Sequence, residues 1–323
     1  MRPLAFSDRL ARRLGLLNPD SSIRINQPIL RMIIGMHLLA LFASIPWLFS
    51  WSGLGIAVAG LYLFGTLGIN IGFHRLLTHR GFECPLWLEH ALSVLGVCCC
   101  QGTPLNWVAV HRMHHQHSDE ADDPHSPHGG FFWSHMGWFL IDDPTVYNVS
   151  LYDRYARDLF RDRFYKQMER PYLFRRIQMA QWGVFLVIGA VIGFFTGDDP
   201  LWDTVQMSLS WLVWGMFVRT VAVWHITWSV NSLSHIWGYR NYTTSDDSKN
   251  NWLVGLVSNG EGWHNNHHAE PRSVKNGHRW WELDVSYLTV LAWSCVGLAW
   301  NLVTPKQRHA AEPPAEEEKR KAA

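Results

Sequence analysis

The sequence lacks several features that would place it in common classes of protein. Five cysteines form no CxxC pair, and three of them are adjacent at Cys98–Cys100, so a disulfide-stapled secreted domain is not indicated. A net charge of +1 gives no sign of a nucleic-acid partner. The first 27 residues carry five arginines but no early apolar core, and no cleavable signal peptide is expected there.

Hydrophobic and aromatic residues are abundant instead. They make up 48% and 14% of the 323 residues, and the 19 tryptophans are typical of chains that meet a membrane–water interface. We expect a cytosolic N-terminal arm over residues 1–27, one domain over 28–303, and a disordered charged tail over 304–323.

Four apolar segments are long enough to cross a bilayer or nearly so, and they occur in two pairs. The turns within the pairs, at Ser52-Gly53 and at 197–203, contain no Lys or Arg, whereas the N-terminal arm and segment 152–176 are rich in Arg. Because basic segments stay on the cytoplasmic side, we predict an all-α integral membrane protein of two helical hairpins with its polar segments in the cytoplasm. The spans are expected at 29–51, 54–71, 180–196 and 204–228.

Two further apolar stretches are less clear. Residues 86–100 are short and contain Glu89 and His90, which favours a helix in the membrane interface. Residues 285–303 are long enough to span, and a span there would move only the tail.

Histidine is concentrated in three clusters on separate segments. The last two clusters share the spacing HxxHH, which places imidazoles at i, i+3 and i+4 on one face of a helix. A further pair, Asn231 and His235, follows the fourth apolar segment. Nine imidazoles are too many for one metal and suit two, and iron held by nitrogen ligands activates O2 when two external electrons are supplied. The clusters are His74 and His79; His111, His114 and His115; and His264, His267 and His268.

The other histidines receive different interpretations. His37, His90 and His225 are expected to be packing residues. Four more lie near the second cluster and are expected to be donors behind the ligands or turn residues, with Asp123-Pro124-His125 forming a turn. These four are His117, His125, His128 and His135.

With these motifs, the chain resembles the membrane fatty-acyl desaturase family over roughly residues 28–300. The resemblance implies four transmembrane helices under a cytosolic cap with a di-iron site, and a C-terminal helix that lies on the membrane. It implies insertion of a cis double bond, at Δ9, into a saturated acyl chain with O2. The family's ligands fall on His74, His79, His111, His114, His115, His235, His264, His267 and His268, with Asn231 acting through water. The motifs are GFHRLLTHRGFE, NWVAVHRMHHQHSDEADDPH, GGFFWSHMGW, TWSVNSLSHIWGYR and GEGWHNNHH.

One departure concerns the acyl carrier. Animal acyl-CoA members usually have Arg-Asp before the second cluster, where this chain has Ala109-Val110. The choice between acyl-CoA and acyl-lipid therefore stays open. No HPGG stretch occurs, so a fused cytochrome b5 domain is not expected.

Two further predictions concern the acyl path and the electron donor. Counting back in fours from His74 gives a stripe of Asn70, Thr66, Tyr62 and Val58, which either lines the acyl path or packs against another helix. Segment 152–176 has eight basic residues against four acidic ones, which suits docking of an acidic ferredoxin or cytochrome b5, or binding of anionic lipid.

Three other functions remain open on the histidines alone. A related di-iron hydroxylase acting on alkanes, carotenoids or sphingolipids would use the same ligands. A membrane metal-binding protein would need no electron donor. A di-haem carrier would place its histidines within the spans, whereas these lie just outside them.

Overall fold

The computed structural model describes residues 24–143 and 149–305, and within them it is helical. Pairing between extended segments is limited there to isolated bridges such as Glu83 with Trp300. The all-helical prediction is confirmed for this part of the chain. The predicted N-terminal arm and charged tail fall almost wholly outside the described residues.

Four helical stretches are long and apolar enough to cross a membrane. Three are built from more than one helical segment. They are Gln27–Ser44, formed by α2 (Gln27–Ala40) and η1 (Leu41–Ser44); Trp51–Thr78, formed by α3 (Trp51–Gly60) and η3 (Leu61–Thr78); Pro171–Thr196, which is α9; and Pro200–Ile236, formed by α10 (Pro200–Leu212), η7 (Val213–Val218) and α11 (Arg219–Ile236). Their number agrees with the sequence prediction.

The first turn lies earlier than the predicted Ser52-Gly53. The chain is extended at Ile45, before Pro46, and makes a short 3-10 turn, η2 (Pro46–Leu48). A residue before proline is pushed out of the helical region, so the helix ends there. The next helix begins after Ser50, whose hydroxyl accepts from the Gly53 backbone N–H at 2.9 Å, and Ser52-Gly53 therefore fall in its first turn.

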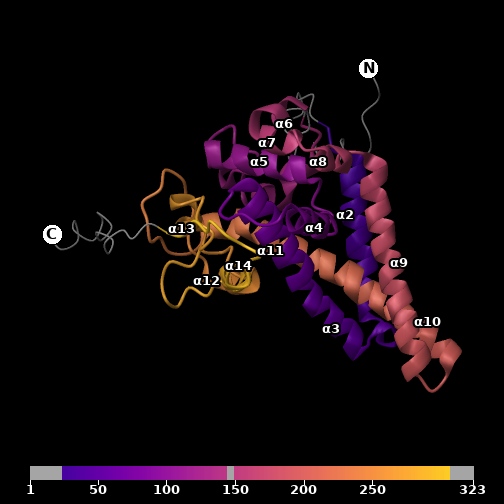
Figure 1. Ribbon diagram of the computed structural model, residues 1–323. Helices are drawn as coiled ribbons and strands as arrows, with labels where there is room; N and C mark the ends of the chain where they lie inside the picture. Colours follow the sequence, from indigo (N-terminus) through magenta and orange to yellow (C-terminus); the bar gives the residue numbers. More distant parts are fainter. Residues whose placement is uncertain (1–23, 144–148, 306–323) are drawn as a thin grey trace, which may run out of the picture.

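Helices α9 and α10 pack closely and are joined by a short turn (Figure 1). Asp199 caps α10 by accepting from the backbone N–H groups of Leu201 and Trp202. Gly189 makes the close approach possible, because a Cβ there would lie 2.6 Å from the Met207 carbonyl oxygen.

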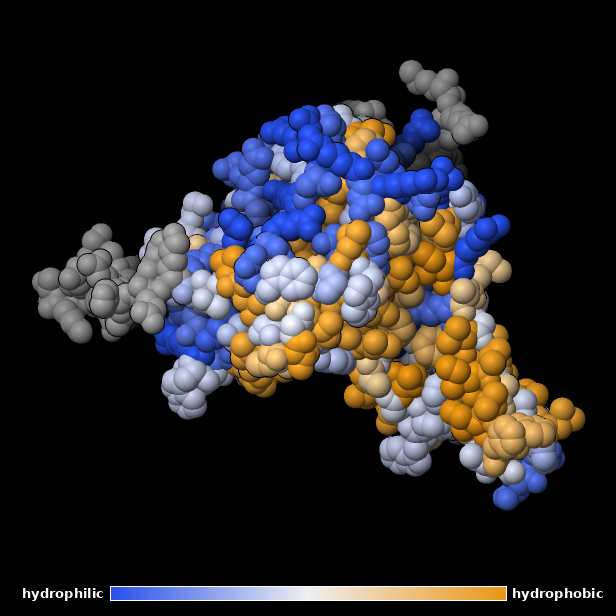
Figure 2. Space-filling view, viewed as in Figure 1, coloured by the Kyte–Doolittle hydropathy of each residue, from blue (hydrophilic) through white to orange (hydrophobic). Residues whose placement is uncertain are grey.

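Shorter helices gather at one end of the long ones (Figure 1). In the space-filling view, hydrophilic residues cover this end, whereas the projecting parts of α3, α9 and α10 are largely hydrophobic (Figure 2). The short helices are α5 (Pro104–His117), η4 (Pro127–Gly129), η5 (Trp133–Gly137), η6 (Trp138–Leu140), α6 (Val149–Tyr155), α7 (Arg157–Phe160), α8 (Arg163–Met168), α12 (Trp252–Val257) and α13 (His264–Ala269).

The two ambiguous apolar stretches form short helices, α4 (Leu86–Val97) and α14 (Val285–Cys295). The 11 residues of α14 extend about 17 Å at 1.5 Å per residue, well below the roughly 30 Å of a hydrocarbon core. The helix ends at Cys295, and the chain returns to bond Glu83 and Gly81. The possibility that 285–303 spans is therefore not supported.

Candidate metal centre

The nine predicted histidines converge at the polar end of the long helices. Their nitrogens form two groups, in each of which one ligand atom per residue lies within 4.8 Å of all the others. We call these groups the five-histidine cluster and the four-histidine cluster. The first comprises His74, His79, His111, His115 and His267; the second comprises His114, His235, His264 and His268.

Local helix geometry explains the spacing of each histidine motif. Helices α5 and α13 place i, i+3 and i+4 side chains on one face. The first motif has the wider spacing i, i+5, and it lies at the end of η3, which is a π-helix. There the His79 backbone N–H donates to the His74 carbonyl at 3.1 Å, the i+5 bond of a π-turn. The two rings are brought to a centroid separation of 4.7 Å.

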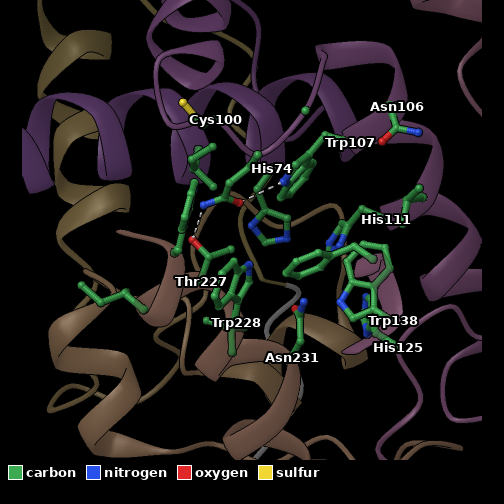
Figure 3. Close-up of a pocket in the computed structure, with 18 of the residues that line it drawn as sticks. His74, Cys100, Asn106, Trp107, His111, His125, Trp138, Thr227, Trp228 and Asn231 are labelled. Carbon is green, nitrogen blue, oxygen red and sulfur yellow. Dashed lines mark hydrogen bonds between the residues drawn. The ribbon is translucent and has the colours of Figure 1, made fainter. Parts of the chain in front are cut away.

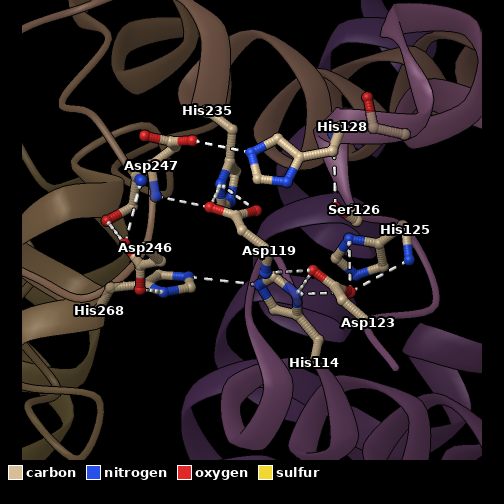
Figure 4. A network of polar contacts seen from close by, with 12 residues as sticks. His114, Asp119, Asp123, His125, Ser126, His128, His235, Asp246, Asp247 and His268 are labelled. Carbon is tan, nitrogen blue, oxygen red and sulfur yellow. Dashed lines mark hydrogen bonds and ion pairs between the residues drawn. The ribbon is translucent and has the colours of Figure 1, made fainter. Parts of the chain in front are cut away.

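Four carboxylates orient histidines of these clusters, and sequence reasoning did not identify them as partners. Each accepts from the Nδ1 atom of one ring and leaves its Nε2 atom facing a cluster. The pairs are His74–Glu261 at 2.6 Å, His114–Asp123 at 3.0 Å, His235–Asp119 at 3.2 Å and His268–Asp246 at 2.7 Å. Figure 4 shows the last three. Asp123 also accepts from the His125 backbone N–H, as the predicted turn requires.

The charges and the lone pairs of the residues in these clusters favour binding of a cation. Burial lowers the pKa of His114 and His268, so both rings are neutral. Burial alone would raise the pKa of Asp123 and Asp246, but their histidine partners hold it well below the usual range, so both are ionised acceptors. The Nδ1–H groups of His114 and His268 thus donate to these carboxylates. The lone pairs on their Nε2 atoms face each other, and the two Nε2 atoms are 3.4 Å apart.

A metal ion between these nitrogens would offset that repulsion, and their spacing suits one. Two nitrogens about 2.1 Å from one ion, with bonds at a right angle, lie about 3 Å apart. The Nε2 atoms of His74 and His267 are 3.0 Å apart, and those of His235 and His264 are 3.1 Å apart. The donor set therefore fits two metal ions held by nitrogen.

A cavity of about 290 Å³ reaches the clusters. His74, His111 and His264 lie on its wall together with the predicted Asn231, one turn before His235. Figure 3 shows Asn231 and His111 on one side and Cys100 on another. The remaining wall is mostly apolar and aromatic and comes from α2, α5, α11 and the segment at η6.

The four residues of the predicted stripe on η3 and α3 have different surroundings. Asn70 lines the cavity and donates to the Ser258 carbonyl at 2.7 Å. Thr66 accepts from Asn259, and the Tyr62 hydroxyl bonds Thr289 at 2.8 Å. Val58 is 60% exposed. Thr66, Tyr62 and Val58 are not among the residues that line the cavity.

The other histidines lie outside the two clusters. His225 bonds both His37, at 3.0 Å, and His135, at 3.1 Å, and so connects α11 with α2 and η5. His90 stacks on Phe164 and bonds Asp162, which agrees with a packing role. His117 and His128 pair with the carboxylates of Glu120 and Asp247. His125 lines the cavity beside Asp123.

Comparison with known proteins places the chain in a family. The fatty acid desaturase model matches residues 45–285. An sn-1 stearoyl-lipid 9-desaturase of Anabaena variabilis is 42% identical over 83% of this chain and 90% of its own length. An sn-2 palmitoyl-lipid 9-desaturase of Nostoc sp. (strain 36) is 40% identical over 90% and 95%. An acyl-CoA C20 Δ5-desaturase of Anemone leveillei is 35% identical over 85% and 81%.

A match over most of the chain, by a family model and by relatives of similar length, agrees with the histidine motifs and the four apolar helices. The protein is therefore an oxidoreductase that acts on fatty-acyl chains, and it belongs to the fatty acid desaturase family.

Proposed function

We propose that this chain is an acyl-lipid Δ9 desaturase with one iron in each histidine cluster. The observation that carries the proposal is the convergence of nine imidazole nitrogens, from segments far apart in sequence, beside a cavity with apolar walls. The histidines would be the protein ligands of both ions, and Asn231 would act through a water molecule. The reaction would take two hydrogen atoms from adjacent methylenes, use O2, two electrons and two protons, and yield a cis alkene and two water molecules.

The protein's contribution is to hold the metals and position one pair of methylenes. Iron with O2 would supply the oxidising power that a side-chain base lacks, because an unactivated methylene is too weak an acid for proton abstraction. The cavity wall excludes water and fixes the chain. Gln101 crosses part of this wall, donating to the Thr227 hydroxyl at 3.0 Å and accepting from the Trp107 indole at 3.4 Å.

We infer a lipid carrier rather than CoA. Among the described residues, those that line the cavity include no Lys or Arg, the side chains that bind a polyphosphate headgroup. Ala109 and Val110 are buried, and Val110 is part of the cavity wall. Two of the relatives above are named as lipid desaturases. The acyl path would begin at Asn70 and follow the cavity, while Thr66 remains a prediction for the stripe along it and Tyr62 or Val58 a prediction for its far end.

The membrane arrangement is part of the proposal. The four long helices would form two hairpins, with their turns away from the cytoplasm and both clusters in a cytoplasmic cap. Ferredoxin or cytochrome b5 would supply the electrons. The uneven distribution of hydrophilic surface supports this orientation (Figure 2).

The test is expression in a host that lacks unsaturated fatty acids, followed by mass spectrometry of its lipids. We expect a Δ9 double bond in glycerolipid-bound chains, and its loss in a His267→Ala variant. A gain of one oxygen atom in place of the loss of two hydrogens would identify a hydroxylase. Active-condition protein that holds zinc alone would favour a metal-binding protein.

A further inference from the structure

The carboxylates that face the two clusters are unevenly distributed. Three of the four rings in the four-histidine cluster donate Nδ1 to an aspartate, namely Asp119, Asp123 or Asp246. In the five-histidine cluster only His74 has such a partner, Glu261. Among the described residues, no carboxylate pairs with His79, His111, His115 or His267.

The charge behind the five-histidine cluster is also partly compensated. The Arg75 side chain is 1% exposed and pairs with Glu261 at 2.7 Å and with Asp284 at 2.9 Å. The two carboxylates and the guanidinium together carry a net charge of −1.

Within residues 24–143 and 149–305, no Lys or Arg pairs directly with the carboxylates of the three aspartates; Arg240 donates to the backbone carbonyl of Asp246 and pairs with the neighbouring Asp247 instead. Asp246 accepts from Ser248 and Thr244, Asp119 accepts from the Asp247 backbone N–H, and Asp123 accepts from backbone N–H groups. Three carboxylates therefore contact rings of the four-histidine cluster directly, and each lies one imidazole away from its centre (Figure 4).

We propose that the two metal sites differ in kind: the four-histidine cluster binds its iron more tightly and stabilises the trivalent ion, whereas the five-histidine cluster holds a divalent ion. This inference rests on the proposed di-iron function. A carboxylate that accepts from Nδ1–H makes the opposite nitrogen a stronger donor, and such partners contribute roughly 10–100-fold to metal affinity. Negative charge in a buried region also favours the higher oxidation state by Coulomb attraction.

This difference in affinity and oxidation state would give the two ions different roles. The three aspartates would favour the trivalent state of an ion in the four-histidine cluster, while both clusters reach the cavity, one through His74 and His111 and the other through His264. Asp119, Asp123 and Asp246 are therefore positioning residues that act through the histidines and touch neither substrate nor metal.

The test measures metal binding and spectra rather than turnover. Purified holoenzyme enriched in 57Fe is titrated with a chelator, and the iron remaining per chain is followed by metal analysis and Mössbauer spectroscopy. The wild type should release its two irons in two steps and show two distinct spectral components. Asp246→Asn keeps the size and an acceptor oxygen but removes the charge, and it should release the first-oxidised iron at a chelator concentration about 10–100-fold lower.

Three other variants complete the design. Glu261→Gln should weaken the other iron and leave the first-oxidised component unchanged. Asp247→Asn is the matched control, because Asp247 is adjacent to Asp246 but pairs with the exposed His128 and Arg240. If Asp246→Asn does not fold, Asp119→Asn tests the same cluster.

Two equal irons released together in the wild type, or equal loss of both in Asp246→Asn, would overturn the inference while leaving the proposed function intact. Absence of bound iron in active protein would instead overturn the proposed function.

Discussion

Arg75 is a charged residue within a long apolar helical stretch, and it is completely surrounded by protein. It holds Glu261 and Asp284 together and donates to the Val274 carbonyl at 2.7 Å. Glu261 in turn fixes the ring of His74. One guanidinium therefore supports both the folding of the polar region and the orientation of a proposed metal ligand.

Removing that cation should be costly. Arg75→Met leaves two buried carboxylates without their partner, and breaking a buried pair in this way destabilises by about 3–5 kcal/mol. Thermal unfolding of the purified protein measures the loss. Arg157→Met is the control, because Arg157 forms an exposed pair with Asp153, and its removal should leave stability almost unchanged. Equal effects of the two substitutions would show that the Arg75 network is not stabilising.

Cavity shape is also decided by single residues. Cys100 lines the cavity on the side away from His111 (Figure 3), and Cys100→Phe should narrow that end and shift the products toward shorter acyl chains. Lipid analysis of cells fed chains of mixed length gives the readout, with Cys98→Ala as the control. A longer preferred chain in Tyr62→Ala, with no change in Cys100→Phe, would place the far end on the predicted stripe instead.

The histidines could be predicted from sequence, but their carboxylate partners could not. HxxHH is a rare spacing with a direct geometric meaning on a helix. Asp119, Asp246 and Glu261 are ordinary acidic residues in sequence, and each is matched to its histidine only by tertiary folding. The cavity wall was missed for the same reason, since α2 and α11 form it together.

Helices are held in register by a few specific contacts. Arg112, next to His111, donates to the carbonyls of Leu77, Thr78 and Tyr155 and to Asp158. Asp158 also accepts from Arg80, next to His79. One carboxylate on α7 thus connects the segments that carry the first two histidine motifs.

This clamp predicts a pH dependence. Burial alone would raise the pKa of Asp158, but Arg112 and Arg80 lower it from 3.8 to about 2. A depressed pKa in the folded state contributes stability above the unfolded pKa, and that stability is lost as pH falls through the folded value. Asp158→Asn should therefore cost about 1 kcal/mol near neutral pH after solvent screening, and the difference should shrink between pH 4 and pH 2. Thermal unfolding across this range tests it, and a constant difference would exclude the clamp.

The close contact of α9 with α10 is a second feature at this scale. Gly189→Leu should force the helices apart, because no rotamer of a larger side chain avoids the Met207 backbone. The free energy of unfolding should fall by about 1–3 kcal/mol. Gly183→Leu is the control and should have little effect, because no atom lies within 4 Å of a Cβ at that position. The existence of the four long helical stretches could be predicted from hydropathy. Where they begin and end depends on local residues, such as Pro46 in the first turn and the Asp199 cap of α10.

At the scale of the whole molecule, segment 152–176 forms a basic part of the polar surface. All eight Lys and Arg residues of segment 152–176 are exposed, whereas two of its four acids are paired with groups outside the segment, Asp158 with Arg112 and Asp162 with His90. The basic surface is connected through Arg112 to the helix that carries His111. Its position suits a docking site for an acidic electron donor.

Charge reversal tests that surface. Arg161→Glu combined with Lys166→Glu should lower the rate of reduction by ferredoxin at low salt about tenfold and flatten its dependence on ionic strength. Arg272→Glu with Arg279→Glu, at exposed sites outside the segment, is the matched control. An unchanged rate together with weaker binding to anionic vesicles would assign the surface to lipid headgroups.

The opposed nitrogen lone pairs of His114 and His268 have a consequence for how the protein is made. In the proposed di-iron protein, an ion between these rings would offset their repulsion at the junction of α5 and α13 and would stabilise the contact between the two helices. Newly synthesised chains in an iron-starved cell should accumulate in an open form that proteases degrade. Iron supply would then set the amount of this protein in the membrane as well as its turnover.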